Sequence, residues 1–179
     1  MTLLTAIPPL DAILAAHAAE IGADMTPYRN HAYRMANFCL SLVPPEPESV
    51  EKVGIAAAFH DLGIWTDRTF DYLEPSVRVA AAWLGESGKG GWIPEISEMI
   101  REHHKLTRWR GDPAWLVEPF RRGDWVDVTR GLLRFGVAGD LIRAAYTEWP
   151  DAGFHRLLVR LELGHLRRHP LNPLPVFRL

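Results

Sequence analysis

The sequence lacks the features on which several protein classes depend. It has a single cysteine, Cys39, so it can form neither an intrachain disulfide nor a cysteine-based zinc site. No stretch is long and apolar enough to span a bilayer, and the N-terminus does not combine a positive region with an apolar run as a secretion signal does. We therefore expect a cytoplasmic protein that does not associate with membranes.

Sequence motifs for several common activities are also missing. The chain contains no phosphate-cradling GxxxxGK[ST], no dinucleotide-binding GxGxxG and no GxSxG of serine hydrolases. A net charge of −2 gives no global attraction to nucleic acid, and we expect no nucleic-acid partner. The charge is uneven, because residues 91–179 carry 14 basic and 11 acidic side chains whereas residues 1–90 carry 6 and 11.

What the chain does contain is one helical pattern after another. Hydrophobic residues make up 47% of its 179 residues, which suits one domain with a sizeable core. No alternation of apolar and polar residues indicates a strand. We predict an all-α, single-domain bundle of about seven to eight helices, over about residues 10–21, 26–43, 47–62, 75–86, 94–106, 125–135, 138–149 and 151–169, followed by an extended tail.

Two of these helices have clear boundary signals. Thr26 and Pro27 fit the N-cap and the first position of the second helix. Gly63 is placed to end the third helix. The start of the helix over residues 125–135 stays open, because prolines precede it.

His60 and Asp61 form the most informative pair in the chain. They follow the apolar run 55–59, which is typical of a buried helix. Burying both side chains would be costly unless something satisfies them, and imidazole and carboxylate are both ordinary ligands of a divalent metal. The alternative is a helix end that has reached solvent, with His60 near the negative end of the helix dipole.

Other ionisable residues accompany this pair on separate predicted helices. His31 precedes it, and His103, His104 and Asp124 follow it. The order His, His-Asp, His-His, Asp resembles the HD-domain superfamily of metal-dependent hydrolases, which are helical bundles. The resemblance extends from about residue 28 to residue 131. It implies a single HD-type domain over residues 1–179, with a C-terminal helix and tail over about residues 151–179.

The resemblance implies a metal site and a reaction. By their places in the motif, the ligands would be His31, His60, Asp61 and Asp124. Two imidazoles and two carboxylates admit one divalent ion of Mn, Fe, Zn, Mg, Co or Ni. The expected activity is hydrolysis by a metal-activated water, on a small phosphoester or nucleotide. Asp127 is a rival for Asp124 on the same helix face, and we interpret it as a residue behind the ligands or a surface carboxylate.

The same region supplies candidate catalytic and substrate-binding residues. His103, His104 and Asp67 are candidates for catalysis, and Arg34, Lys105 and Arg68 are candidates for binding an anionic substrate. No histidine lies between Asp61 and His103, which argues against a complete second metal site. Glu74 or Asp71 would be the substitute ligand. The sequence does not decide which of His103 and His104 faces the site.

Three alternative functions stay open. HDLGIW and FRRGDWVDVTRG also resemble the cyanamide-hydratase-like branch of the superfamily, in which a metal-bound water adds to a nitrile. A diiron oxygenase is known in the same superfamily, and the missing histidine counts against it. A non-catalytic module with a structural metal is the third. The sequence is compatible with a homo-oligomer but does not determine the oligomeric state.

Overall fold

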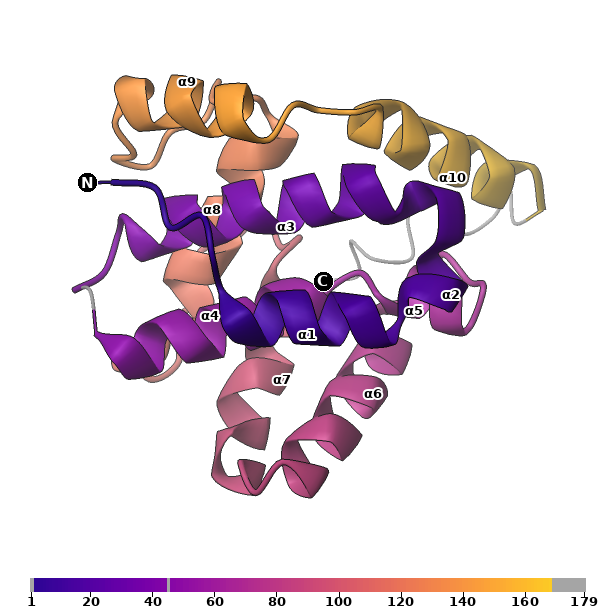
Figure 1. Ribbon diagram of the computed structural model, residues 1–179, viewed down its shortest axis with the longest axis horizontal. Helices are drawn as coiled ribbons and strands as arrows, with labels where there is room; N and C mark the ends of the chain where they lie inside the picture. The colour runs from indigo at the N-terminus through magenta and orange to yellow at the C-terminus, as the bar shows by residue number, and fades with distance from the viewer. Residues whose placement is uncertain (1, 45, 169–179) are drawn as a thin grey trace.

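The computed structural model describes residues 2–44 and 46–168, and within them it contains helices and turns but no strand (Figure 1). This confirms the all-α prediction. The eight longer helices are α1 (Pro8–Ala16), α3 (Met25–Leu40), α4 (Pro47–Phe59), α6 (Leu73–Glu86), α7 (Ile93–Glu102), α8 (Val117–Val128), α9 (Gly139–Glu148) and α10 (Phe154–Arg168). Short turns of helix complete the set: α2 (Ala18–Ile21), α5 (Gly63–Thr66), η1 (Gly22–Asp24) and η2 (Gly90–Trp92).

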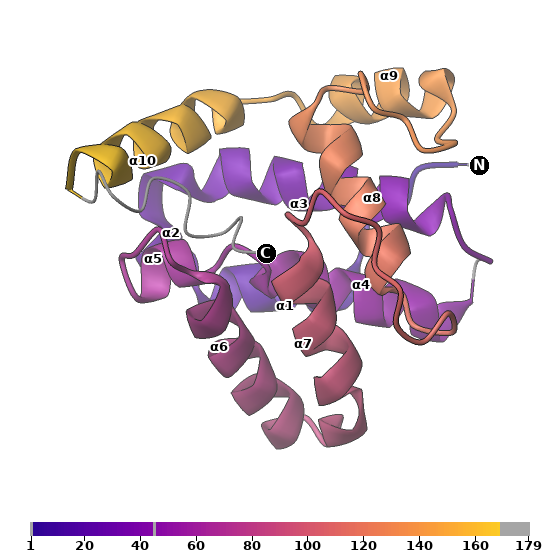
Figure 2. The same cartoon turned by 180° about the vertical axis from the view of Figure 1, so that it is seen from behind.

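Helix α3 is the centre of the bundle. It crosses the middle of the molecule in both views, with α1 and α4 on one side and α9 and α10 on the other (Figures 1 and 2). Thirteen of its 16 residues are buried, including polar ones, so it is enclosed on nearly all sides. A helix in this position can present side chains toward several neighbours at once.

Helix α8 packs against α3 at very short range. A Cβ atom added to Gly123 would lie 2.7 Å from the carbonyl oxygen of Met35 and 2.8 Å from the backbone nitrogen of Cys39. Only a glycine therefore allows the two backbones to approach so closely. The contact brings the carboxylates of α8 next to the histidine of α3.

The second helix begins and ends earlier than predicted. Helix α3 starts at Met25, which makes Asp24 the N-cap residue and places Thr26 inside the first turn. No side chain caps the start of the helix with a hydrogen bond, so the prediction of Thr26 as the N-cap residue was wrong. The helix stops at Leu40 rather than at Val43.

The helix that carries the His-Asp pair is also shorter, and Gly63 has a different role. Helix α4 ends at Phe59, and Gly63 begins the single turn α5. A Cβ atom on Gly63 would lie 2.5 Å from the carbonyl oxygen of Tyr72. The glycine is required for this close approach and not for ending the helix.

The predicted helix over residues 125–135 is wrong in its second half. Helix α8 ends at Val128, and Arg130 and Gly131 have positive φ angles of 51° and 75°. Leu132 is 88% exposed, so the apolar residues of this segment do not form a buried helical stripe.

Two further differences concern the first and the last helix. The first predicted helix is interrupted at His17, between α1 and α2. The last one starts at Phe154, and its predicted end and the extended tail over residues 169–179 lie outside the described residues. Among the described residues, no helix has both the length and the apolar character needed to cross a membrane.

Candidate metal centre

Four segments that are distant in the sequence bring histidines and aspartates together beside α3. His31 comes from α3 and Asp124 from α8, while the His60–Asp61 and His103–His104 pairs lie in the turns after α4 and α7. The side chains of all but His104 are at most 2% exposed, and that of His104 is 14% exposed. The structure therefore brings all four predicted metal ligands and both predicted histidines into one buried cluster.

The turn after α4 explains how two adjacent residues can face the same point. Neighbouring residues within a helix diverge by about 100°. Here the regular helix stops at Phe59. The N–H of Leu62 then donates to the carbonyl oxygen of Phe59, three residues earlier instead of four, at 3.0 Å. His60 and Asp61 lie in this turn, and both side chains point inward.

The histidine tautomers are fixed by oxygen acceptors. Nδ1 of His60 lies 2.8 Å from the carbonyl oxygen of Ala57, and Nδ1 of His103 lies 2.6 Å from that of Ile100. A carbonyl oxygen can only accept, so both Nδ1 atoms carry the hydrogen. In the neutral rings, each Nε2 then presents a lone pair to the cluster, which is the form that ligates a metal.

His31 is held in the same way by a carboxylate. Its Nδ1 lies 2.7 Å from Oδ2 of Asp127, and its Nε2 lies 2.9 Å from Nε2 of His60. Two lone pairs would repel at this distance, so a proton or a cation must lie between the two nitrogens. Two adjacent ligands at about 2.1 Å from one octahedral ion are separated by about 3 Å, so the pair fits a shared ion.

The two carboxylates complete this set of donors. Oδ2 of Asp61 lies 3.2 Å from Nε2 of His60, and Oδ1 of Asp124 lies 3.5 Å from Nε2 of His31. Within the described residues, Oδ1 of Asp61, both oxygens of Asp124 and Nε2 of His103 are buried without a hydrogen-bond partner. Unpartnered buried acceptors are expensive, and a cation would satisfy all four.

Asp61 connects two groups of donors. Its Oδ2 faces His31 and His60, while its Oδ1 lies 3.4 Å from Nε2 of His103 and 4.0 Å from Nε2 of His104. In each group the three ligand atoms lie within 4.8 Å of one another. Both histidines of the pair therefore face the cluster, where the sequence left the choice open.

The electrostatic surroundings favour neutral imidazoles at most of these positions. Burial lowers the pKa of His31 and of His103, and it lowers the pKa of His104 to about 4. His60 is different, because the neighbouring Asp61 raises its pKa although burial acts in the opposite direction. The carboxylate of Asp61 thus favours a proton on His60, whereas burial disfavours one on His31.

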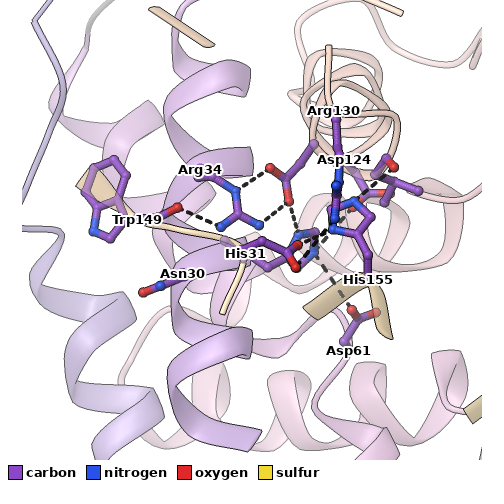
Figure 3. Close-up of polar contacts among 12 residues, drawn as sticks. Asn30, His31, Arg34, Asp61, Asp124, Arg130, Trp149 and His155 are labelled. Atoms are coloured by element: carbon purple, nitrogen blue, oxygen red, sulfur yellow. Dashed lines mark hydrogen bonds and ion pairs between the residues drawn. The ribbon is translucent and has the colours of Figure 1, made fainter. Parts of the chain in front are cut away.

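Asp127 is not a ligand in this arrangement but holds one in place. Asp127 is fully buried, and its carboxylate bonds Nδ1 of His31. This agrees with the interpretation of Asp127 as a residue behind the ligands and not with that of a surface carboxylate. Arg34 forms a bidentate pair with it at 2.6 and 2.8 Å and donates to the carbonyl oxygen of Trp149 at 2.9 Å (Figure 3). The guanidinium of Arg34 is thus committed to protein oxygens, which corrects its predicted role in binding substrate.

The remaining predicted residues lie elsewhere. Asp67 is at the surface and bonds Arg78 at 2.6 Å, and its neighbour Arg68 is exposed. The structure does not bring either of them into the cluster. Lys105 follows the histidine pair directly, and its carbonyl oxygen accepts from Trp125 at 3.1 Å.

Neither substitute ligand joins the cluster. The exposed carboxylate of Glu74 pairs with Arg101 at 2.7 Å, and Asp71 belongs to neither donor group. Tyr72 comes to the cluster instead, since its hydroxyl forms a short hydrogen bond with Nε2 of His104.

Two aromatic contacts of the cluster were not predicted. The ring of Phe154 stacks on His31 with 4.0 Å between centroids and 11° between planes. The hydroxyl of Tyr28 donates to the carbonyl oxygen of Ala58 at 2.9 Å, just before the His-Asp pair. Tyr28 precedes His31 by three residues, and this helical spacing was a usable signal. Nothing in the sequence connected Phe154 to the site.

Comparisons of the chain with protein-family models, with curated proteins and with solved structures found no match. Support for a metal centre therefore comes from its own side chains: their types, their burial and their convergence.

Proposed function

We propose that this protein is a metal-dependent hydrolase of the HD type, acting on a small phosphoester or nucleotide. One observation carries the proposal. Histidines with oxygen-fixed Nδ1 atoms direct their Nε2 atoms toward two buried aspartates, and three of the four oxygens of these aspartates lack a hydrogen-bond partner among the described residues. Such a set is poorly suited to a metal-free core, where each unpartnered group would reduce stability.

His31, His60, Asp61 and Asp124 would hold the principal ion, and Asp61 with His103 and His104 would hold a weaker second one. A divalent cation in such a site lowers the pKa of bound water and polarises the bond that is attacked. Histidine and carboxylate together leave the choice between Mn, Fe, Zn, Mg, Co and Ni open.

The surrounding residues orient these ligands and contact the substrate. Asp127, anchored by Arg34, fixes the ring of His31 and its tautomer. His104 is the only donor with appreciable exposure, and its pKa of about 4, lowered by burial, keeps it neutral at pH 7. The Tyr72 hydroxyl bonds Nε2 of this neutral imidazole, so at the solvent side of the cluster His104 is placed to contact the substrate.

Addition of water to a small nitrile is a second candidate, favoured by the burial of the cluster. Apart from His104, none of the six donors is more than 2% exposed. A compact, linear substrate such as cyanamide approaches so enclosed a centre more easily than a nucleotide does. This candidate uses the same ligands.

A substrate panel with defined metal loading tests the proposal. The protein is loaded with each of the six metals in turn and assayed on p-nitrophenyl phosphate, nucleoside monophosphates and cyanamide. We expect turnover of one class that is lost in Asp61→Asn and kept in Asp140→Asn, whose side chain is 90% exposed. Turnover that is equal in wild type and Asp61→Asn would rule out the assigned site. If no metal supports turnover of any class, the hydrolase proposal is wrong.

A further inference from the structure

The long connection between α7 and α8, residues 103–116, borders a second feature away from the metal centre. In Figure 2 it runs along the outside of α8 before entering that helix. It is anchored at both ends: the carbonyl oxygen of Lys105 accepts from Arg121 at 3.0 Å, and the N–H of Leu116 donates to Glu95 at 2.7 Å. Between these anchors it lines a cavity of about 570 Å³ together with the first turns of α8 and Leu42.

The polar lining of this cavity is basic. Arg108 and Arg110 come from the connection and Arg122 from α8. Glu118 is the one acidic residue of the lining, and its oxygens already accept from Arg121 and Arg122 at 2.8–2.9 Å. In the described part of the chain, no carboxylate pairs with Arg108 or Arg110. These guanidiniums are suited to bidentate recognition of a phosphate or carboxylate.

The apolar lining is flat and aromatic. The rings of Trp109 and Trp115 are nearly parallel, with 12° between planes and 6.1 Å between centroids. The indole of Trp109 lies directly over Gly111, where a Cβ atom would be 2.1 Å from the ring. The backbone N–H of Trp109 donates to Glu118 at 3.0 Å. The carboxylate that pairs with Arg121 and Arg122 of α8 therefore also positions this part of the connection.

We propose that this cavity binds a nucleoside phosphate, with the phosphates at Arg108, Arg110 and Arg122 and the base against the indoles of Trp109 and Trp115. Its volume lies within the range of about 300–1000 Å³ for small-molecule sites and exceeds what a bare phosphate needs. Stacking on an aromatic ring is available to every base, and guanidiniums supply the charge. None of the lining residues is a donor of the metal centre, so the site is separate from the proposed catalytic one.

Calorimetric titration with adenosine 5′-methylenediphosphonate tests the charged half of this site. The P–C–P bridge of this probe resists hydrolysis. We expect binding that weakens at least about tenfold in Arg108→Ala/Arg110→Ala, since two charge-assisted contacts are lost. The matched control Arg143→Ala/Arg160→Ala removes the same charge from side chains that are 74% and 69% exposed and outside the lining. An equal loss in both variants would mean general electrostatic attraction and would overturn the proposal.

Three further titrations test the base and the location. Methylenediphosphonate without the nucleoside should bind about tenfold more weakly, because the stacking contribution is absent. Equal affinity would reduce the cavity to a simple anion site and refute a nucleoside phosphate ligand. Binding should persist in Asp61→Asn, and its loss there would place the probe at the metal centre instead. Binding of a single-stranded oligonucleotide without binding of the mononucleotide analogue would identify a nucleic-acid surface and also overturn the proposal.

Discussion

The nitrogens of His31 and His60 face each other at 2.9 Å, and this contact defines the chemistry of the centre. Both rings have their Nδ1 hydrogens committed to oxygen acceptors. The gap between the Nε2 atoms must therefore contain a positive charge, either a proton or a metal ion. The choice between the two depends on pH.

Metal affinity should fall with acidity. Asp61 raises the pKa of His60 above its ordinary value against the effect of burial, so the metal-free protein keeps this proton to a higher pH. A metal ion must displace this proton from His60. The affinity for the metal should therefore be constant above the raised pKa of His60, and below it should fall by about tenfold per pH unit for each proton displaced. Titrations of metal-free protein with Mn²⁺ or Zn²⁺ at several pH values measure this. An affinity that does not change between about pH 5.5 and about pH 8 would contradict the shared-ion geometry.

The histidine pair after α7 should matter for turnover more than for retention of the principal metal. His103 and His104 approach Oδ1 of Asp61, whereas His31 and His60 approach its Oδ2. We expect His103→Ala/His104→Ala to retain one metal ion and to lose about a hundredfold or more in kcat. Elemental analysis and steady-state kinetics on the same sample provide the check. A double variant that binds no metal would show that one of these residues is a ligand of the principal ion.

The side-chain chemistry was easier to predict than the partners of each side chain. His31, His60, Asp61 and Asp124 share a cluster as expected, because each type is an ordinary metal ligand and each occupied a recognisable place in a helical pattern. Arg34 was predicted to bind substrate, but it is buried against Asp127. That pairing joins residues 93 positions apart, and no local pattern encodes it.

At the scale of elements, the approach of α3 to α8 determines the geometry of the site. The two helices carry His31 and Asp124, whose ligand atoms lie 3.5 Å apart. Gly123 is adjacent to Asp124 and allows the contact between the backbones. Anything that separates the helices also separates these ligands.

Replacing Gly123 by alanine should destabilise the protein and weaken the metal site together. The new Cβ would overlap backbone atoms of Met35 and Cys39, and overpacking of this kind costs about 1–3 kcal/mol. The control is Gly85→Ala on α6, where no atom lies within 4 Å of the added Cβ and stability should rise by about 0.5–1 kcal/mol. Urea unfolding measures the stability of both variants, and metal titration measures their affinity for the metal. If Gly123→Ala binds metal as tightly as the wild type, the helix contact does not control the site.

Helix boundaries were predicted less well than helices. Gly63 looked like a helix terminator, yet its position reflects the passage of the Tyr72 carbonyl at a distance that only tertiary structure sets. Leu132 extended an apolar helical pattern but lies in a turn after α8. At Gly63 a local rule was overridden by packing between segments that are not neighbours in the sequence, whereas before Leu132 the chain leaves the helix through the positive φ angles of Arg130 and Gly131.

For the whole molecule, the centre joins α3, α8 and the turns after α4 and α7. A metal bound there would tie these segments together and would bind only the folded chain. Ligand binding of this kind raises the free energy of unfolding by about 2.7 kcal/mol when the metal concentration is 100 times its Kd. The fold and the site are therefore thermodynamically linked.

Removal of the metal should lower the thermal stability of the protein. For a chain of this size we expect chelator to reduce Tm by about 5–10 °C, and added metal to restore it. Differential scanning calorimetry measures the shift. The Tm of His60→Ala should not respond to chelator, and a response of the same size in that variant would place the stabilising ion elsewhere.

Metal content tests the central claim most directly. We predict that protein purified without chelator contains at least one divalent transition metal or magnesium ion per chain by inductively coupled plasma mass spectrometry. Folded His60→Ala and Asp61→Ala proteins, verified by circular dichroism, should contain none. Unchanged metal stoichiometry in both variants, or a wild-type protein that binds no metal even after incubation with each candidate ion, would contradict the account.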